Sequence, residues 1–246
     1  MFNYKMTIQY DGGRYKGWQR LGGGENTIQA KIEQVLSEMV GYKLEIIGCS
    51  RTDAGVHAIA QIANFKLDNY VPEKEIRSYL GRYLPQDISI LEVIMAEESF
   101  HSRYLAKDKT YLYKIWNEEY SNPFMRKYSM HVSGLLNVTA MQEASKYFLG
   151  EHDFTAFSNA KSKKKSMVRN IRAIDLELKG GFLNIRICGD GFLYNMVRWM
   201  VGALVEVGLG NRKPEDITQM LLSKDRNQTG NLADACGLYL EKIRYE

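Results

Sequence analysis

The sequence predicts an α+β fold of two similar halves, and three observations indicate it. Residues 2–10 alternate between apolar and polar positions, as in a half-buried strand. Residues 28–39 carry apolar residues at the spacing of a helix face. A comparable succession of strands and helices follows after residue 105. With 246 residues, 45% of them hydrophobic, the chain can form one large domain or two small ones.

The first half, residues 1–105, is expected to contain strands and helices around one conspicuous loop. Its first helix is expected to start at a capping box of Asn26 and Gln29 and to end at Gly41. The loop is the segment 50–58. The other expected elements are strands over 43–49, 59–67 and 88–95 and a helix from about Pro72.

The second half, residues 106–246, is expected to repeat the theme. Two alternating segments, 174–178 and 183–187, predict a hairpin that turns at Gly180 and Gly181. The other expected elements are a strand over 110–116, a helix over 138–149, a buried helix over 192–207, a helix starting at Pro214 and a last strand over 237–245. Two α+β halves facing each other across a cleft would result.

Composition and cysteine usage indicate a cytoplasmic protein. No run of about 18 uncharged apolar residues occurs, and the first ten residues alternate rather than resembling a leader peptide. We therefore expect neither export nor a membrane span. The three cysteines are odd in number and far apart, which fits neither a disulfide framework nor a zinc site.

Basic residues are concentrated in two segments, although the net charge is only +4. One segment is rich in glycine and carries Tyr15 and Trp18 among its basic residues, which are Arg14, Lys16 and Arg20. The other spans residues 161–169 and is rich in lysine. Basic groups that bind phosphates, interleaved with rings that stack on bases, are typical of RNA binding. The alternative is two solvated loops without a ligand.

The loop 50–58 is the main candidate for chemistry, because it places Asp53 between two expected strands. Rigid strands commonly display catalytic groups on such loops. The same loop contains Arg51 and His57. The alternative is a tight turn in which Asp53 bonds neighbouring backbone amides.

Arg198 is the second candidate, because its neighbours in the apolar segment 192–202 are all uncharged. A buried guanidinium needs an anionic partner from elsewhere in the chain. Asp53 is the candidate partner, and the pairing would keep its carboxylate ionised at neutral pH. The alternative is a structural ion pair with Glu206, which lies two turns later.

Tyr111 is the third candidate, and it shares one strand face with Tyr113. This strand follows the basic and aromatic string FHSRY at 100–104, which includes Arg103. A tyrosine on a strand usually belongs to the core. Beside an aspartate and an arginine, it could instead stack on a flipped base.

The loop SRTDAGVHA resembles the GRTDAGVHA signature of A-type tRNA pseudouridine synthases, with Ser50 where that family usually has glycine. A position that needs positive φ would strain a serine there. Further blocks resemble the family in the same order along the whole chain: YDG at 10–12, GWQR at 17–20, FHSR at 100–103, KTYLY at 109–113, DFTAF at 153–157, MVR at 196–198 and GLYL at 237–240.

The resemblance implies an enzyme that isomerises uridine to pseudouridine at positions 38, 39 and 40 of the tRNA anticodon stem-loop. It implies the pseudouridine synthase fold, a homodimer, and neither cofactor nor metal. Asp53 would be the catalytic aspartate, Tyr111 the ring that stacks on the target base, and Arg198 the partner of the aspartate. Arg51 would hold the target nucleotide out of the stack. The expected RNA contacts are Arg14, Lys16, Arg20, Arg51, His57, Arg103 and Tyr111.

The sequence is also compatible with three other functions. The same chemistry could act on another RNA, since only the surrounding surface would differ. The chain could also be a tRNA-binding or tRNA-folding module without activity, against which the presence of Asp53, Tyr111 and Arg198 argues. A metal-dependent nuclease would need clustered carboxylates, and Asp53 has no acidic neighbour closer in sequence than Glu45.

Overall fold

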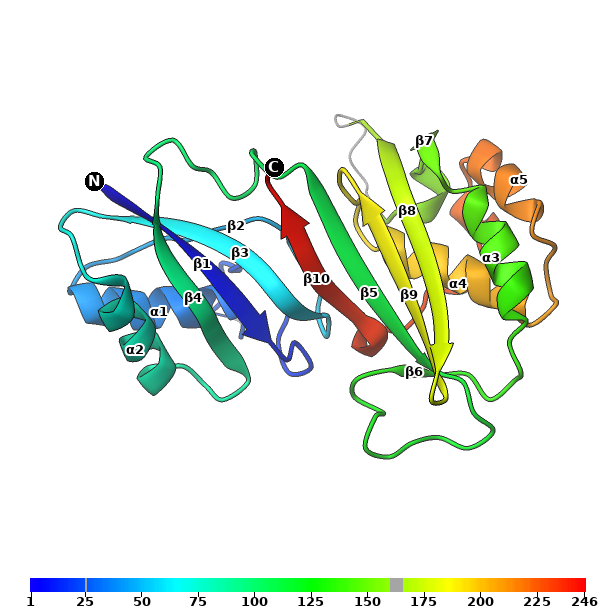
Figure 1. Ribbon diagram of the computed structural model, residues 1–246, viewed down its shortest axis with the longest axis horizontal. Helices are drawn as coiled ribbons and strands as arrows, with labels where there is room; N and C mark the ends of the chain where they lie inside the picture. The colour runs from blue at the N-terminus through cyan, green and yellow to red at the C-terminus, as the bar shows by residue number, and fades with distance from the viewer. Residues whose placement is uncertain (25, 160–165) are drawn as a thin grey trace. The chain divides into compact units, whose positions relative to one another are not determined.

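The computed structural model describes residues 1–24, 26–159 and 166–246. The described chain forms two compact units, shown in Figure 1. Unit 1 consists of Met1–Lys107 together with Tyr239–Glu246, and unit 2 consists of Asp108–Leu238. Both combine a mostly antiparallel sheet with helices, so the expected α+β class is confirmed.

Unit 1 is built on a sheet with the strand order β4-β1-β3-β10. Its strands are β1 (Phe2–Tyr10), β3 (His57–Leu67), β4 (Ile88–Ala96) and β10 (Leu238–Arg244), and the short β2 (Ile47–Gly48) also pairs with β3. Strand β1 runs antiparallel to both β3 and β4. Its alternation is confirmed, because Tyr4, Met6 and Ile8 are completely buried.

Two helices, α1 (Ile28–Val40) and α2 (Glu73–Tyr83), supply the rest of the core of unit 1. Helix α1 buries Ile28, Ile32 and Leu36, the stripe that the sequence predicts. Its N-cap is Thr27 rather than Asn26, because the Thr27 hydroxyl accepts a hydrogen bond from the amide of Ala30 at 3.3 Å. The predicted C-terminal glycine is confirmed: Gly41 caps the helix with φ of 80°.

The predicted strand over 43–49 is wrong in extent, since only Ile47–Gly48 is a strand. The preceding backbone is bonded to side chains of α1 instead of to a neighbouring strand. Ser37 Oγ accepts from the amide of Leu44 at 2.9 Å, and Glu33 Oε1 accepts from the amide of Ile46 at 3.0 Å. These bonds satisfy the amides without a sheet ladder.

The last strand, β10, belongs to unit 1 although it ends the chain. It lies parallel to β3, with Tyr239 opposite His57 and Leu240 opposite Ala58 (Figure 1). The compact units therefore differ from the division at residues 105 and 106 that chain order suggests. The local pattern of a seven-residue strand does not say which sheet it joins.

Unit 2 is built on a sheet with the order β5-β9-β8-β7. Its strands are β5 (Asp108–Trp116), β7 (Gly150–Asp153), β8 (Val168–Lys179) and β9 (Phe182–Gly189), and the short β6 (Met130–His131) lies parallel to β5. The predicted hairpin is confirmed: β8 and β9 turn at Gly180 and Gly181, whose φ values are 58° and 78°. Both lie in the left-handed region that glycine tolerates.

The helices of unit 2 are α3 (Val138–Lys146), α4 (Met196–Gly208) and α5 (Asp216–Ser223). Short 3-10 turns lie at Thr155–Phe157, Arg226–Gln228 and Ala235–Gly237. Helix α4 starts four residues later than predicted, because Asn195 adopts φ of 62° immediately before it. A residue in the left-handed region cannot continue a right-handed helix.

Candidate active site

The loop that carries Asp53 lies in unit 1, between β2 and β3, and the glycine-rich segment 11–20 packs against it. The amide of Trp18 donates to the carbonyl oxygen of Thr52 at 3.0 Å, and the amide of Gly55 donates to that of Tyr15 at 3.3 Å. The hydroxyls of Tyr10 and Thr52 are hydrogen bonded at 2.7 Å. Asp53 is half-buried within this framework. The two segments thus form one fixed assembly.

The close approach of the two loops requires glycine at position 17. Gly17 has φ of 94°, and a Cβ atom there would lie 2.5 Å from the Thr52 carbonyl oxygen and 3.0 Å from the carbonyl carbon of Asp53. Any side chain at this position would displace the backbone that carries the carboxylate. The glycine of the GWQR motif is therefore required for steric reasons.

Asp53 does sit in a tight turn, which the backbone closes. The amide of Val56 donates to the carbonyl oxygen of Asp53 at 3.1 Å, and Gly55 has φ of 79°. The turn is therefore closed by a backbone hydrogen bond, and it is compatible with the candidate catalytic role of Asp53.

Ser50, the departure from the family signature, is accommodated without strain. Among the non-glycine residues that the structure describes, only Asn195 and Lys224 have positive φ. The buried amide side chain of Gln61 holds Ser50 at both backbone groups: its Oε1 accepts from the serine amide at 3.1 Å, and its Nε2 donates to the serine carbonyl at 2.6 Å. Sequence reasoning missed Gln61; its signal is a polar residue at a buried position of a strand.

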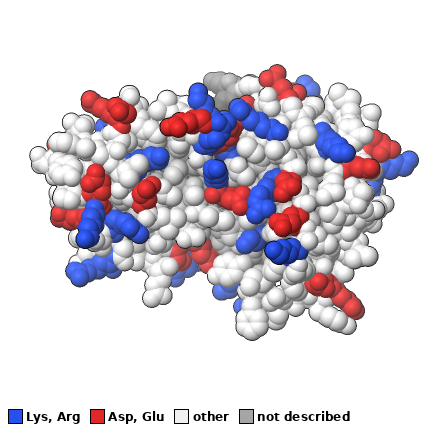
Figure 2. Space-filling view, viewed as in Figure 1, with Lys and Arg blue, Asp and Glu red and all other residues white. Residues whose placement is uncertain are grey.

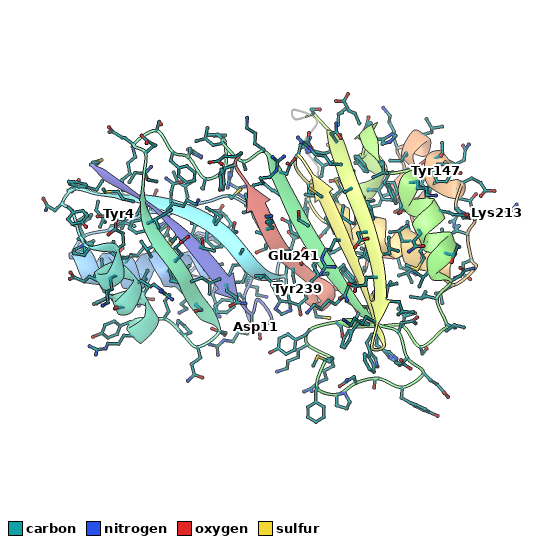
Figure 3. All side chains as sticks on the ribbon, viewed as in Figure 1. Tyr4, Asp11, Tyr147, Lys213, Tyr239 and Glu241 are labelled. Atoms are coloured by element: carbon teal, nitrogen blue, oxygen red, sulfur yellow. The ribbon has the colours of Figure 1, made fainter. Side chains whose placement is uncertain are left out.

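His57 is buried, with 2% of its surface exposed, and its ring joins three segments of unit 1. It stacks on Tyr239 at 4.8 Å, and its Nδ1 accepts from the amide of Gly12 at 3.1 Å. Nδ1 also lies 3.0 Å from Asp11 Oδ1. Figure 3 labels both Asp11 and Tyr239. Accepting from Gly12 needs an Nδ1 without a proton, whereas donating to Asp11 needs a proton on Nδ1. This buried position suits a residue that holds the loops together better than one that contacts RNA.

The basic residues expected to bind RNA fall into two groups in unit 1. Arg14 forms an ion pair with Asp87, and Arg20 pairs with Glu33 at 3.0 Å and with Glu45 at 2.6 Å. These carboxylates neutralise the charges of Arg14 and Arg20. On the face shown in Figure 2, basic and acidic residues are likewise interspersed.

Lys16, Arg51 and Arg103 form the second group, for which the structure describes no ion pair. Lys16 and Arg51 are exposed, and Arg103 is half-buried, with Nη2 donating to the carbonyl oxygen of Gly48 at 3.3 Å. The other expected basic segment, residues 161–165, lies outside the described residues.

Tyr111 and Tyr113 lie on β5 in unit 2, and both are buried, with 8% and 0% of their surfaces exposed. The hydroxyl of Tyr113 donates to the carbonyl oxygen of Asp234 at 2.7 Å, and burial raises the pKa of Tyr113 well above its ordinary value. Tyr113 is therefore a core residue. Phe192 contacts the Tyr111 ring edge-to-face, with centroids 5.1 Å apart and planes at 81°, which holds the orientation of that ring.

Arg198 is half-buried rather than fully buried as expected. Its Nε donates to the carbonyl oxygen of Ala233 at 2.7 Å, and its Nη1 donates to Asn195 Oδ1 at 3.0 Å. No ion pair with Glu206 exists in the part of the chain that the structure describes; Glu206 accepts instead from Asn211 at 3.0 Å. Arg198 thus has two neutral acceptors in unit 2, which the apolar sequence around it did not predict.

Neither unit contains, in its described part, a helix long and apolar enough to span a membrane. Within the same residues, no group of three His, Cys, Asp or Glu side chains is placed to hold a metal ion.

Comparison with known proteins relates the whole chain to one family. The family model described as tRNA pseudouridine synthase matches residues 6–104 and 144–246. The chain is 65% identical to a tRNA pseudouridine synthase A of Bacillus sp. (strain KSM-64) and 61% identical to a tRNA pseudouridine synthase A 2 of Bacillus cereus (strain ZK / E33L), each over 100% of both chains.

A more distant relative, a tRNA pseudouridine synthase A 2 of Clostridium tetani, is 45% identical over 99% of this chain and 98% of its own. A solved Cbf5-Nop10-Gar1 complex is similar at 12% identity and a TM-score of 0.34, over 82% of this chain and 54% of that chain. The full-length identities and the family match lead to one conclusion: this chain belongs to the tRNA pseudouridine synthase family.

Proposed function

We propose that this protein converts uridine to pseudouridine in the anticodon stem-loop of tRNA, at positions 38, 39 and 40. The observation that carries the proposal is the rigid display of Asp53. Its loop is fixed on one side by the segment 11–20 and on the other by Gln61, in a chain that shares 65% of its residues with a tRNA pseudouridine synthase A. An enzyme that reacts with a sugar must hold its catalytic group in a fixed position relative to that sugar, and rigid surroundings achieve this.

The reaction needs few components. The bond between N1 and the ribose C1′ breaks, a bond between C5 and C1′ forms, the proton on C5 leaves, and N1 takes up a proton. No atom is gained or lost overall, so the chemistry calls for no cofactor. The Asp53 carboxylate serves as nucleophile at the sugar or as base toward a ribose proton, and both roles need its ionised form.

Tyr111 and Arg198 complete the proposed site. A base flipped out of a stem costs a few kcal/mol to extrude, and stacking on an aromatic ring offsets about 1–3 kcal/mol of that cost. Tyr111, whose orientation Phe192 holds, is the proposed stacking ring. Arg198 is proposed to act on the ionised Asp53. A guanidinium has five N–H donors, so its bonds to Ala233 and Asn195 leave donors for a carboxylate.

The proposal also covers the localisation, the oligomeric state and the binding partner of the protein. By resemblance to its family, the protein is proposed to act in the cytoplasm as a homodimer that binds tRNA. Lys16 and Arg51 are the exposed basic residues of unit 1 proposed to contact the RNA. For Arg14 and Arg20 we propose a structural role instead. Their ion pairs with carboxylates of the protein stabilise the segment 11–20.

The decisive experiment maps pseudouridine in RNA from cells that contain or lack this protein. Loss of pseudouridine at tRNA positions 38–40, restored by the wild-type chain and not by Asp53→Asn, is the expected result. Loss confined to another RNA would favour the same chemistry on a different substrate. Unchanged pseudouridine with altered tRNA folding would favour the non-catalytic binding module. Activity of the purified protein should persist in a chelator, and complete loss there would contradict a metal-free reaction.

A further inference from the structure

Glu33, in the middle of α1, is a buried carboxylate of unit 1, with 4% of its surface exposed. Burying a carboxylate is costly even when it is paired, and well-packed apolar side chains in place of a buried ion pair are often neutral or stabilising. The stability of the fold alone therefore does not call for a glutamate at this position. A requirement for directed hydrogen bonds, which fix the place of other segments, does call for one.

Both oxygens of Glu33 contact segments outside α1. Oε1 accepts from the backbone amide of Ile46 at 3.0 Å, and it also accepts from the side chain of Gln29 in the preceding turn of the helix at 2.8 Å. Oε2 accepts no hydrogen bond from the described residues, and it lies 3.0 Å from Arg20 Nη1 in an ion pair. The carboxylate thus links α1 to the backbone before β2 and to the end of the glycine-rich segment 11–20.

Gln29, which is 6% exposed, holds the same two segments. Its Nε2 donates to the carbonyl oxygen of Ile46 at 3.2 Å as well as to Glu33. Its Oε1 accepts from the backbone amide of Arg20 at 3.0 Å and from Gln19 Nε2 at 2.8 Å. Both backbone groups of Ile46 are therefore bonded to α1, and so is the end of the glycine-rich segment. A buried polar network of this kind rigidifies the elements that it joins.

The glycine-rich segment is bonded directly to the loop that carries Asp53. The amide of Trp18 donates to the carbonyl oxygen of Thr52 at 3.0 Å, and the carbonyl oxygen of Trp18 accepts from the amide of Gln29 at 3.0 Å. One buried residue of this segment thus bonds α1 on one side and the Asp53 loop on the other. Any movement of the segment relative to α1 is passed on to the loop.

The backbone at Ile46 leads into the same loop along the chain, because Ile46 lies seven residues before Asp53. Between these two residues, Gly48 packs against the Trp18 ring so closely that a Cβ atom at Gly48 would lie 2.4 Å from it. Helix α1 is therefore connected to the Asp53 loop by two routes, one through Trp18 and one through Ile46. Glu33 contacts the segments at the start of both routes.

We propose that Glu33 is a positioning residue for Asp53. Its carboxylate fixes α1 to the two segments that set the place of the loop, and its burial keeps it from contacting RNA itself. The inference rests on the proposed function, because it takes Asp53 as the reacting group, and it adds a residue two steps away from the reaction. Misplacing a reacting group by about 1 Å can lower a rate about 10²-fold.

The first test measures tRNA affinity and the single-turnover rate of pseudouridine formation for the wild type, Glu33→Gln and Glu45→Gln, below the unfolding temperature of all three. Glu33→Gln keeps the size of the side chain and removes its charge. It should lower the rate at saturating enzyme roughly tenfold, the weight of one charged hydrogen bond, and leave the affinity unchanged. Glu45→Gln is the matched control, because it removes the other carboxylate partner of Arg20, whose side chain is 62% exposed. It should leave both quantities unchanged.

Three results of the first test would overturn the proposal. A wild-type rate in Glu33→Gln would show that the carboxylate does not matter for the reaction. An equal loss of rate in Glu33→Gln and Glu45→Gln would mean that only the charge balance around Arg20 matters. A lower affinity with an unchanged rate at saturating enzyme would assign Glu33 to RNA binding instead of to the placement of Asp53.

A second test needs no RNA and separates a positioning residue from one that only stabilises the fold. It follows amide hydrogen exchange in the wild type and in Glu33→Gln. The amides of Trp18, Gly55 and Val56, whose hydrogen bonds hold the Asp53 loop, should exchange roughly tenfold faster in the variant. Amides in the ladder between β1 and β4 should be accelerated less, because their exchange requires a larger opening of the sheet. Acceleration of both groups by one common factor would show general destabilisation and overturn the proposal.

A second variant covers the case in which Glu33→Gln does not fold. Arg20→Gln removes the partner of Glu33 from a half-buried position and leaves the hydrogen bonds to Ile46 and Gln29 in place. It should act in the same direction on the rate and on the exchange of the loop amides. The double variant should be little slower than either single variant, because both changes break the same contact. Losses that add would mean that the two residues act separately and would contradict the network.

The two tests distinguish failure of this inference from failure of the proposed function. Faster exchange confined to the loop amides, in a protein whose wild type makes no pseudouridine, would retain Glu33 as the residue that holds the loop and reject the proposed function. Pseudouridine formation by the wild type, with an unchanged rate and unchanged loop exchange in Glu33→Gln, would retain the proposed function and reject the role of Glu33.

Discussion

Arg198 donates a hydrogen bond from Nη1 to the side-chain oxygen of Asn195 at 3.0 Å, and the same asparagine adopts φ of 62° at the start of α4. One residue thus performs two tasks: it turns the backbone into the helix, and it holds the guanidinium that the helix carries. Asparagine tolerates the left-handed region better than most residues, whereas a typical side chain there costs roughly 1–2 kcal/mol. Backbone strain of this kind recurs at functional sites.

Asn195 is therefore expected to be a positioning residue for Arg198. Asn195→Gly keeps the backbone conformation and removes the acceptor, so it should lower kcat roughly tenfold, the weight of one charged hydrogen bond, with little change in stability. Asn195→Ala should lower kcat similarly and also destabilise the fold by about 1 kcal/mol, because alanine resists positive φ. Steady-state kinetics and thermal unfolding of both variants provide the check. A glycine variant with wild-type kcat would show that the hydrogen bond does not orient Arg198 for the reaction.

Asp53→Asn should bind tRNA with nearly wild-type affinity and form no pseudouridine. The amide keeps the shape of the side chain and removes the ionised oxygen that the reaction needs. Filter binding and single-turnover assays on the same tRNA measure the two properties separately. Unfolding curves of both proteins check that the variant folds. Appreciable turnover would remove Asp53 from the mechanism.

Tyr111 should tolerate loss of its hydroxyl better than loss of its flat ring. Tyr111→Phe keeps the ring face and its contact with Phe192, so most RNA affinity should remain. Tyr111→Leu keeps an apolar side chain in this 8%-exposed position but removes base stacking worth about 1–3 kcal/mol. Affinity and single-turnover rates are measured after unfolding curves show that both variants fold. Equal behaviour of the two variants would mean that the ring is not a base platform.

Asp153 is expected to stabilise unit 2 in a pH-dependent way. Burial acts to raise the pKa of its carboxyl, but hydrogen bonds from Lys224 and Thr155 outweigh burial and leave the pKa below its ordinary value. A depressed folded-state pKa means that the contribution is present above the unfolded-state pKa of about 4 and is lost as pH falls through the folded-state value.

Asp153→Asn should therefore lower the free energy of unfolding by about 1 kcal/mol at neutral pH, a value reduced because Lys224 is largely exposed. The difference from wild type should shrink below about pH 4, as measured by urea unfolding across pH. Glu151→Gln, an exposed change of the same charge on the same strand, is the control and should have little effect. A deficit that stays constant down to low pH would show that the charge of Asp153 is not the cause.

The sequence by itself determined those local elements whose apolar residues recur at the spacing of a strand or a helix face, and the glycine turn between two strands. The alternation of β1, the apolar stripe of α1 and the glycine turn between β8 and β9 appear in the structure as expected, because each depends only on neighbours along the chain. The resemblance of several ordered motifs likewise identified the family. Asp53 stands out in the sequence because its loop is polar and lies between two segments that alternate.

Only the tertiary structure decided what each side chain contacts. Side chains of α1 bond the backbone after Tyr42 and leave a strand of two residues, and β10 joins the sheet of the first unit. Neither result follows from local pattern, because the partners lie far apart in the chain.

The charge partners of the arginines could not be predicted for the same reason: the partners lie far apart in the chain. Arg20 and Arg103 are the same residue type, yet folding gives Arg20 two carboxylate partners and gives Arg103 no ion pair among the described residues. Arg198 was expected to be fully buried, and it is half-buried and donates to two neutral acceptors. Charge pairing depends on distances of a few ångströms between segments that are remote in sequence, and these distances exist only in the folded chain.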